Sequence, residues 1–511
     1  MVTDFYDALK SRGLQDILRP VIFTPQLFHN YEKVEAFLDE IAFAPDNSIL
    51  VYGDYDLDGL MFNLITKQLL DSLDCTNYCI FPYWKRTHDL DREAVRFCIQ
   101  NKIEYFIIGD TASTSLELLQ ELSAYGIKVL VIDHHVCCYS YDDYPENVTV
   151  ISSYIENQLQ GFSKYAYSAA ALAYVVYDLY AKSRSLNFAE SSSAYALTSL
   201  YSDCMDMSNE FNRAIYYRAK SIEREKLPTF IRHFMNEHQA FNARFIGFWF
   251  APRINALFRG ENFELLNRYF FDSSLDSIGR SRCIEVINDY YKSNREMVQQ
   301  LVDLIDVVEY EHFVIANEQT ALDKCPTLLK NPQNYTGLIA NKLSERYRKT
   351  SIVYALNNNY YKGSVRDLYG RSYLPIFKNF CYAAGHNAAF GIKINLLDLN
   401  YFFSRIEKID THYSIDTIPN EPIVVKHEFN SPDNTMIEDI ALYNEFSGNS
   451  IPVAFFSKQL VGAMQEKVTR YYHRYDWGTD YFIQSDYAIN FGTKMLIKPI
   501  RSGRTKLLYQ G

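Results

Sequence analysis

Short apolar runs alternate with amphipathic segments along the first third of the chain, and this alternation restricts the possible folds more than any other feature. Strands that alternate with helices form parallel sheets in which crossover helices cover the two faces. The apolar runs are residues 48–53, 77–84, 104–110 and 127–133, and helical spacing of apolar residues occupies 59–73, 90–101 and 114–124. The sequence therefore predicts an α/β fold with a parallel sheet.

Acidic residues follow three of these runs directly. The run SILVYG continues into GDYDLDG, so Asp54, Asp56 and Asp58 come at every second position, and Asp110 and Asp133 end two other runs. Alternate residues of an extended chain project to one side, so the first three carboxylates could converge on a cation. Ligands of parallel sheets bind beyond the carboxyl ends of the strands, which is where all five residues are expected.

The segment GDYDLDG is compatible with more than one interpretation. A solvated acidic loop and a metal site both fit it when it is taken alone. An EF-hand calcium loop does not fit, because the twelfth position from Asp54 is Ile65 instead of Glu and a strand precedes the segment. Gly59 is expected to let the backbone turn sharply into the next helix.

The run VLVIDHHV favours the metal site. His134 and His135 directly follow Asp133 at the end of a strand, and two adjacent histidines in that position are seldom structural. Imidazole and carboxylate ligands together suit Mn²⁺ and related divalent ions. A pair of such ions activates water and holds the oxygens of an in-line displacement at phosphorus. Their charge would also offset the repulsion among the carboxylates.

The rest of the chain changes character several times, as a length of 511 residues allows. Residues 351–356 read as a strand, glycines at 363, 370, 385 and 391 suggest turns, and the tail is rich in short strands. We predict four parts: a catalytic domain over 1–277 with a helical portion at 165–240, a connector helix over 278–310, a mixed α/β domain over 311–405 and a β-barrel-like domain over 406–511.

Composition sets broader limits. The net charge of −11 argues against a protein that coats nucleic acid non-specifically, although a local basic groove remains compatible with it. No apolar run is long enough to span a bilayer, and residues 1–16 are charged and amphipathic, unlike a signal peptide. The nine cysteines lack paired zinc-ribbon spacing and are best explained as reduced thiols. We expect a cytoplasmic protein.

Four segments in order resemble motifs I to IV of the DHH phosphoesterase superfamily. They are GDYDLDG, IIGD, DHH and the aspartate of LTSLYSDCMDMSNEFNR. The segment FWFAPRINALFRGEN (248–262) is similar to the PRxNAxGR segment of the RecJ-type branch, the single-strand DNA exonucleases. KGSVRD (362–367) and AAGHNAAFGI (383–392) resemble the GSxRS and GGHxxAAG elements of the DHHA1 domain. NEFSGNSIPVAFF (444–456) is similar to the start of the branch's oligonucleotide-binding (OB) barrel.

This resemblance runs from about residue 20 to residue 456 and implies a pair of Mn²⁺ or Mg²⁺ ions. By similarity, Asp56 and Asp58 are metal ligands, with Asp54 ligating or orienting the first site. Asp110 would bridge the two ions, and His134 and Asp203 would complete the second site. Asp133 would orient the neighbouring imidazole, and His135 would stabilise charge that develops on the scissile phosphate.

The resemblance also implies a set of residues that bind nucleic acid. They share a capacity to donate hydrogen bonds to phosphate, and the planar fork of arginine matches phosphate oxygens best. These residues are Arg253, Asn255, Ser364, Arg366, His386 and Arg86. Tyr83 and Trp84 are candidates for stacking on bases in a narrow cleft between two domains, although packing in the core explains Trp84 at least as well.

Two of the departures from the family pattern bear on the geometry of the site. Motif II usually continues Asp-Asn-Gly or Asp-Cys-Gly, whereas here Asp110 is followed by Thr111 and Ala112, so a different loop geometry is expected. Asp367 replaces the last serine of GSxRS, and its negative charge would repel a phosphate unless it points away. Arg371 and Ser372, in the segment GRS, are the alternative residues for phosphate binding. Such divergence is typical of an outlying member, for which a phage origin is one explanation.

The leading hypothesis from the resemblance is a 5′–3′ exonuclease that degrades single-stranded DNA to mononucleotides in repair, recombination or replication. It would act as a monomer on single-stranded nucleic acid, with a single-strand binding protein as a further partner. A phosphodiesterase acting on short oligonucleotides or cyclic dinucleotides is an alternative, but the PRINA segment and the long tail argue against it. A catalytically inactive scaffold is another, and the retained metal ligands argue against that.

Overall fold

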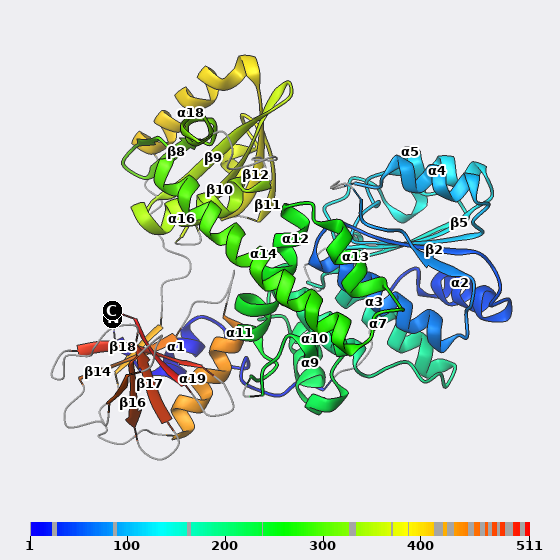
Figure 1. Ribbon diagram of the computed structural model, residues 1–511, viewed down its shortest axis with the longest axis horizontal. Helices are drawn as coiled ribbons and strands as arrows, with labels where there is room; N and C mark the ends of the chain where they lie inside the picture. Colours follow the sequence, from blue (N-terminus) through cyan, green and yellow to red (C-terminus); the bar gives the residue numbers. More distant parts are fainter. Residues whose placement is uncertain are drawn as a thin grey trace. The chain divides into compact units, whose positions relative to one another are not determined.

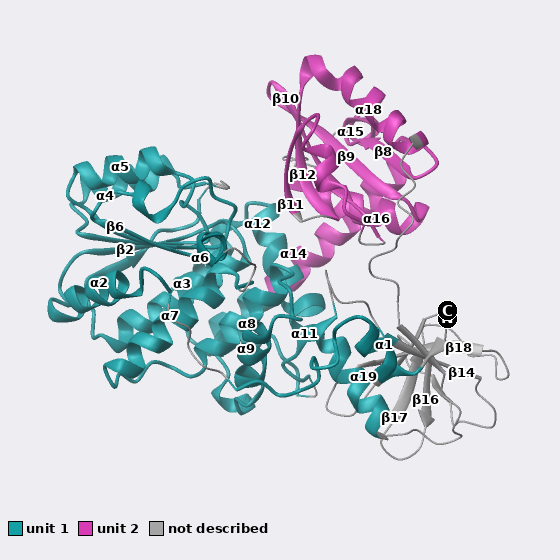
Figure 2. Cartoon of the chain, turned by 180° about the vertical axis from the view of Figure 1, so that it is seen from behind, with its two compact units in different colours: residues 1–284, 422–511 teal, residues 285–421 magenta. Residues whose placement is uncertain are grey.

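The computed structural model describes two compact units of the chain (Figures 1 and 2). Unit 1 comprises residues 1–284 and 422–511, and unit 2 comprises residues 285–421. The described residues are 2–22, 28–84, 89–160, 165–237, 239–325, 334–368, 371–386, 388–412, 423–426 and 434–447, together with the strand residues 454–459, 466–468, 473–477, 481–485, 494–500 and 506–510.

A five-stranded parallel sheet organises the first part of unit 1, as the alternating pattern predicted. Its order is β3-β2-β4-β5-β6. The strands are β2 (Ile49–Gly53), β3 (Tyr78–Ile80), β4 (Tyr105–Gly109), β5 (Lys128–Asp133) and β6 (Val148–Ser152). Every residue of β2 and β4 is buried, which requires that both faces of the sheet be covered. The α/β class is therefore confirmed.

Helices cover the two faces of this sheet (Figure 1). On one face lie α4 (Arg92–Gln100) and α5 (Leu116–Ala124). On the other lie α2 (Tyr31–Phe43), α3 (Leu57–Ser72) and α7 (Ala169–Ser183), with α6 (Ser153–Gln160) following β6. Nearly all of α7 is buried, because its Ala-rich face packs closely against α3 and the sheet.

A helical portion completes this part of unit 1. Its members are α8 (Ser192–Ser202), α9 (Glu210–Lys220), α10 (Thr229–His233), α11 (Ala243–Phe245), the π-helical turn η3 (Ile246–Phe250), α12 (Ala251–Arg259) and α13 (Phe263–Phe271). Helix α19 (Asn434–Phe446), from the predicted β-rich tail, packs against it through the edge-to-face rings of Tyr216 and Phe446. Helix α1 (Phe5–Ser11) contacts the same C-terminal turn of α19 through Phe5 and Tyr443.

The tail forms one mixed eight-stranded sheet with the order β1-β13-β14-β18-β19-β17-β16-β15. Strand β1 (Val2–Thr3) comes from the other end of the chain and pairs with β13 (Ile423–Lys426). The others are β14 (Ala454–Gln459), β15 (Glu466–Val468), β16 (His473–Trp477), β17 (Tyr481–Ser485), β18 (Lys494–Ile500) and β19 (Lys506–Gln510). The tail is thus rich in strands, whereas the OB type stays a prediction.

Unit 2 contains a six-stranded mixed sheet with the order β11-β12-β10-β9-β8-β7. Its strands are β7 (Val307–Glu309), β8 (Phe313–Asn317), β9 (Thr350–Asn357), β10 (Tyr360–Arg366), β11 (Tyr382–His386) and β12 (Ala389–Asn395). The helices are α14 (Ser277–Leu304), which begins in unit 1, α15 (Gln319–Lys324), α16 (Thr336–Tyr347), α17 (Leu374–Phe377) and α18 (Leu399–His412). The predicted four-part division of the chain is not tested by these units and stays a proposal.

Two apolar clusters sandwich this sheet. Ile339 and Leu343 of α16 pack with Val353 on one face, and Phe377 and Phe402 pack with the strands on the other. The prediction of glycine turns at 363, 385 and 391 was wrong, because these glycines lie inside β10, β11 and β12. At Gly363 a β-carbon would come 2.8 Å from the carbonyl oxygen of Val353, so close packing, not turning, explains it. Gly370 lies outside the described residues.

No helix among the described residues is long and apolar enough to cross a membrane. All nine cysteines are free thiols.

Candidate metal centre

The acidic segments lie at the point where the connections of the parallel sheet reverse direction. After β2 the chain adds β3 on one side, and after β3 it returns to add β4 on the other side of β2. Loops that leave two such strands diverge and open a crevice at their carboxyl ends. Asp54 follows β2 and Asp110 follows β4, and the amide of Asp54 donates to the carbonyl of Gly109, 3.2 Å away. The predicted site therefore lies where this fold binds ligands.

Asp56 begins helix α3. Its Oδ1 accepts hydrogen bonds from the amides of Asp58 (2.8 Å) and Gly59 (3.1 Å), which is the standard side-chain cap of a helix N-terminus. Gly59 lies in the first helical turn, so the expectation of a sharp turn there was wrong. A β-carbon on Gly59 would come 2.3 Å from the amide nitrogen and carbonyl oxygen of Asp54, so glycine allows α3 to lie directly against the end of β2.

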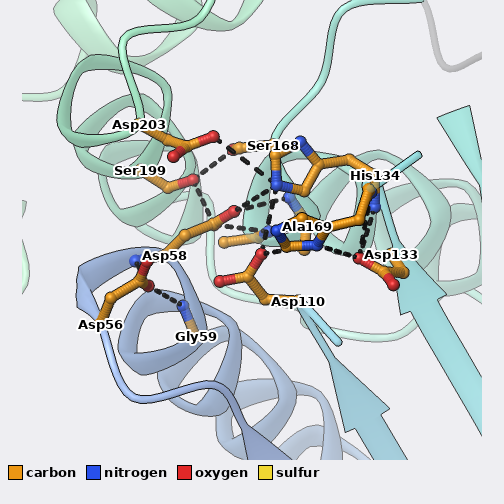
Figure 3. Close-up of polar contacts among 12 residues, drawn as sticks. Asp56, Asp58, Gly59, Asp110, Asp133, His134, Ser168, Ala169, Ser199 and Asp203 are labelled. Carbon is orange, nitrogen blue, oxygen red and sulfur yellow. Dashed lines mark hydrogen bonds and ion pairs between the residues drawn. The ribbon is translucent and has the colours of Figure 1, made fainter. Parts of the chain in front are cut away.

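Asp58 is fully buried and hydrogen bonded at both oxygens (Figure 3). The amides of Ala169 and Ala170, at the start of α7, donate to it at 2.8 and 2.9 Å, and Ser199 of α8 donates at 2.5 Å. A helix N-terminus favours negative charge, so α7 stabilises this carboxylate. Sequence reasoning did not identify Ser199 or the start of α7 as partners of Asp58. The small-residue run SAAALA was the signal that could have indicated close packing at the start of α7.

His134 and Asp203 meet Asp110 in the centre of the site (Figure 3). The Nε2 of His134 lies 3.2 Å from Asp110 Oδ1, 3.6 Å from Asp203 Oδ2 and 3.9 Å from Asp58 Oδ2. Asp203 caps the C-terminus of α8, about 70 positions beyond His134 in the chain. Asp110 has a left-handed backbone (φ 61°), as does Ala112 (φ 78°), and such strain collects at functional sites.

Asp133 contacts His135, the second of the two adjacent histidines. Its Oδ1 lies 2.8 Å from the Nδ1 of His135 and accepts the amide of His134 at 2.7 Å. Its Oδ2 accepts the hydroxyl of Ser113 at 2.5 Å. Asp133 is buried, whereas about half of the His135 side chain is exposed. The carboxylate thus orients an imidazole that is about half exposed.

Three groups of these side chains could each hold a metal ion. Within each group, one ligand atom per residue lies within 4.8 Å of the others. The groups are Asp54 with Asp56 and Asp110, Asp58 with His134 and Asp203, and Asp110 with His134 and His135. Asp110 and His134 each belong to two groups, so the groups are contiguous. The carboxylate oxygens that dominate these groups suit Mg²⁺ and Mn²⁺, and the mixed carboxylate and imidazole set suits Mn²⁺.

The carboxylates of the site are held together against their mutual repulsion. Burial, followed by the charge of Asp58, raises the pKa of both Asp110 and Asp203 well above the usual value. Burial and the charge of Asp56 raise the pKa of Asp58 to about 6. The Oδ2 of Asp203 is buried and accepts no hydrogen bond from the described residues. A cation would relieve both the repulsion and this unsatisfied oxygen, so the donor set fits divalent metal.

Comparison with known proteins agrees with this geometry. The DHH family N-terminal domain model matches residues 48–205, which contain the whole acidic centre. The chain is 23% identical over 467 residues to the single-stranded-DNA-specific exonuclease RecJ of Bacillus subtilis, covering 87% of this chain and 53% of that protein. It is 20% identical to RecJ of Haemophilus influenzae, covering 85% of this chain and 79% of that protein. Residues 48–205 thus match the DHH family, and most of the chain is similar to RecJ-type proteins.

Solved structures of RecJ-type proteins share the fold. RecJ from Thermus thermophilus, in complex with Mn²⁺, superimposes with a TM-score of 0.70 at 16% identity over 99% of this chain and 74% of that one. A second RecJ bound to manganese gives a TM-score of 0.56 at 18% identity, over 77% of this chain and 97% of that one. The chain spans about half the length of the B. subtilis relative.

The RecJ-type PRINA segment lies in α12. Arg253 is buried, its guanidinium stacks 3.7 Å from the ring centroid of Trp249, and its NH1 donates to the Trp249 carbonyl at 2.7 Å. Asn255 is partly buried on the same helix. Tyr83 is buried and hydrogen bonded to Asn63, so the stacking role considered for it was wrong. Trp84 is 46% exposed, and Arg86 lies outside the described residues.

The two segments that resemble DHHA1 elements lie in unit 2, on β10 and on the adjacent β12 with β11. Ser364 and Arg366 belong to β10, and Ser364 exchanges a hydrogen bond of 2.9 Å with Thr336 at the start of α16. A β-carbon on Gly337 would come 2.8 Å from the NH2 of Arg366, so this glycine makes room for the guanidinium. His386 is the last residue of β11 and pairs with Ala389 of β12.

Asp367 points away from this surface. Its side chain is buried and accepts bonds from Nε (3.0 Å) and NH2 (2.7 Å) of Arg371 and from the Thr350 hydroxyl (2.6 Å). An ion pair in which Nε and NH2 of Arg371 both donate to Oδ1 of Asp367 therefore offsets the charge that was expected to repel phosphate. Nε and NH2 of Arg371 are engaged in that pair, and its contribution to phosphate binding stays a proposal.

Proposed function

We propose that this chain is a divalent-metal-dependent 5′–3′ exonuclease that hydrolyses single-stranded DNA to mononucleotides, in repair, recombination or replication. The names of its relatives, the single-stranded-DNA-specific exonucleases RecJ, support this substrate. The observation that carries the proposal is the convergence of Asp54, Asp56, Asp58, Asp110, His134 and Asp203 from four separate segments on contiguous ligand groups. We further propose that it works as a cytoplasmic monomer alongside a single-strand binding protein.

The metal ions in this proposal are two Mn²⁺ or Mg²⁺, the ions named for the Thermus thermophilus RecJ structures. Asp54, Asp56 and Asp110 would hold one, and Asp58, Asp110, His134 and Asp203 would hold the other. Bound there, such ions activate water and neutralise the charge of a phosphodiester and its departing oxygen. Asp58 keeps its place whether or not metal is present, because α7 and Ser199 already hold it.

His135 would act on the scissile phosphate. Burial acts to lower its pKa, but the charge and hydrogen bond of Asp133 raise the pKa to about 10 in the metal-free chain. The Nδ1 contact with Asp133 leaves Nε2 as the donor toward substrate. A protonated imidazole held in this orientation would stabilise the negative charge that develops on a phosphate oxygen.

Substrate binding in this proposal uses Ser364, Arg366 and His386 of the DHHA1 sheet for phosphate, with Arg253 and Asn255 of α12. The support is the position of Ser364 and Arg366 beside each other on one face of β10. The stacking of Arg253 on Trp249 holds that guanidinium in place, and a residue held in this way loses little entropy when it binds.

The test compares the wild-type protein with Asp110→Ala on 5′-labelled and 3′-labelled single strands of increasing length in Mn²⁺. We expect the wild type to release labelled mononucleotide first from the 5′-labelled strand, and Asp110→Ala to lose at least 1,000-fold in rate, roughly 4 kcal/mol of barrier. Equal rates in the two proteins would overturn the metal centre. Faster cleavage of dinucleotides than of long strands would favour the phosphodiesterase that acts on short oligonucleotides.

A further inference from the structure

One face of three neighbouring strands in unit 2 is lined by basic, aromatic and very small residues. Directly paired residues of antiparallel strands share a face, so the register of β10, β12 and β11 defines rows across it. One row is Lys362, Lys393 and Tyr382, which we call the lysine row. The next row is Ser364, Gly391 and Ala384, and the row after it is Arg366, Ala389 and His386.

This face is open on one side and bounded on the other. Helix α16 covers the same face over β9, where Val353, which pairs with Ser364, packs on Ile339 and Leu343. The opposite face of β10 and β12 packs into the second core cluster through residues such as Val365 and Phe390. Along β12, Gly391 and Lys393 are exposed while their neighbours are buried. The rows are therefore exposed on the β12 side and partly buried on β10, where the start of α16 lies against Ser364 and Arg366.

The lysine row holds two positive charges directly opposite each other. Like charges at paired positions of adjacent strands repel, with β-carbons about 5 Å apart. Lys393 makes no ion pair among the described residues, and its ammonium lies 4.1 Å from the ring centroid of Tyr360, the neighbour of the row on β10. The ring side chain of Tyr382 is 68% exposed. A repulsive lysine pair beside an exposed aromatic is a surface suited to an anion that carries a ring.

We propose that the lysine row is a second nucleotide subsite for single-stranded DNA, which takes the phosphate next to the one at Ser364 and Arg366 and stacks a base on Tyr382. The inference rests on the proposed function, since it extends that binding surface along the same strands. Lys362 and Lys393 would share one phosphate between them, and the missing side chain of Gly391 would let the backbone of the nucleic acid approach the sheet.

The geometry of a strand supports this arrangement. Residues two positions apart on one face of a β-strand lie about 6.8 Å apart. This is similar to the distance between successive phosphates in an extended single strand, so one nucleotide advances the ligand by one row. Lysine and aromatic side chains that contact backbone and bases in this way bind without reading sequence, as an exonuclease requires.

The test measures binding separately from cleavage. Full-length protein in EDTA is titrated into 5′-fluorescein-labelled dT₄ and dT₁₆ by fluorescence anisotropy at several salt concentrations, and the same preparations are assayed for cleavage in Mn²⁺. The variants are Lys393→Glu, Lys362→Ala, Tyr382→Ala and Tyr382→Phe. Lys378→Glu is the matched control, because this exposed lysine lies at the end of α17, which packs on the opposite face of the sheet.

We expect Lys393→Glu to weaken dT₁₆ binding about tenfold or more and to lower the slope of log affinity against log salt by about 0.7. Tyr382→Ala should weaken it by about tenfold and Tyr382→Phe should restore it, as stacking requires. Lys378→Glu should bind like the wild type. Equal losses in Lys393→Glu and Lys378→Glu, or unchanged binding in every variant while the wild type still cleaves single strands, would overturn this inference alone. A wild type that neither binds nor cleaves single strands would overturn the proposed function with it.

Discussion

The Oδ1 of Asp133 lies 2.8 Å from the Nδ1 of His135, and this contact connects a buried carboxylate to a half-exposed imidazole at the edge of the acidic centre. Burial acts to raise the pKa of Asp133, but the charge and hydrogen bond of His135 lower it below its usual range. The two shifts describe one ion pair, in which each residue keeps the other charged. Because Asp133 also accepts a bond from Ser113, its own orientation is determined independently of the histidine.

Asp133→Asn should lower kcat about 10- to 100-fold, the usual cost of removing a residue that orients a functional histidine. The amide carries no charge, so the pKa of His135 should fall from about 10 toward its ordinary value. The pKa is measured by NMR titration of the metal-free protein, and kcat in Mn²⁺. Ser113→Ala is the control, since it removes a bond to Asp133 and leaves the imidazole contact. An unchanged pKa of His135 in Asp133→Asn would contradict this account.

Mn²⁺ should stabilise the folded chain, because ligands on four separate segments meet only in the native state. At a concentration 100 times the dissociation constant, the gain in unfolding free energy is about 2.7 kcal/mol. It is measured as the rise in melting temperature with Mn²⁺ relative to EDTA. In the Asp203→Asn variant, Mn²⁺ should raise the melting temperature much less than in the wild type. Asp142→Asn, a change at an exposed aspartate of the same unit, should keep it. A full rise in Asp203→Asn would show that the metal binds elsewhere.

The parallel sheet and the position of the acidic centre could be predicted because their signals are local. Each strand of the centre is a run of apolar residues that ends in an acid, and the topology of a parallel sheet then brings the ends together. Asp203 could be added only by resemblance, because its place depends on how α8 packs on α3 and α7. The local sequence contains no signal that predicts how these helices pack.

Other features were missed because they depend on distant contacts. Strand β1 has only two residues and pairs with β13, more than 400 positions away, so no periodicity reveals it. Helix α19 was overlooked inside a strand-rich tail, although its buried Ile437, Ile440 and Tyr443 have helical spacing. The glycines of β10 and β12 resembled turn residues, since sequence does not show the neighbouring strand that excludes a side chain.

Gly59→Ala should be strongly destabilising, because the new β-carbon would lie 2.3 Å from backbone atoms of Asp54 that cannot move without shifting the end of β2. We expect a loss of about 3 kcal/mol or more in unfolding free energy, the upper range for overpacking a core. Urea denaturation provides the measurement. Gly247→Ala is the control, since a β-carbon added at this helical position would meet no atom within 4 Å, and it should be neutral or slightly stabilising. Similar losses in both variants would contradict the steric explanation.

Ala112→Gly should stabilise the chain. Ala112 has a φ of 78°, and a left-handed conformation costs a residue with a β-carbon about 1–2 kcal/mol. The greater freedom of glycine in the unfolded chain lowers the free energy of unfolding by roughly 0.4–1 kcal/mol, so the net gain in that free energy is about 0.5–1 kcal/mol. Denaturation in EDTA measures it without the contribution of metal. Ala112→Val, which adds branching at the same φ, should be destabilising, and a stable Val variant would contradict the role assigned to strain.

Glu318→Gln should remove a pH dependence from the stability of unit 2. Glu318 is fully buried beside β8, and neither of its carboxylate oxygens has a hydrogen-bond partner among the described residues. Burial raises the pKa of Glu318 from 4.5 to about 9, so the folded protein binds this proton more tightly than the unfolded chain does. Its contribution to stability is therefore fully present below pH 4.5 and is lost progressively as the pH rises toward 9.

Between pH 4.5 and 7 the loss is about 3 kcal/mol, at 1.36 kcal/mol for each pH unit. Urea denaturation of the full chain at pH 5, 6.5 and 8 measures it, with the transition of unit 2 followed separately where two transitions appear. The difference between Glu318→Gln and wild type should grow in favour of the variant as pH rises. Glu345→Gln changes an exposed glutamate of α16 and should give the same difference at every pH. A constant difference for Glu318→Gln would mean that the buried carboxyl group is neutralised in another way.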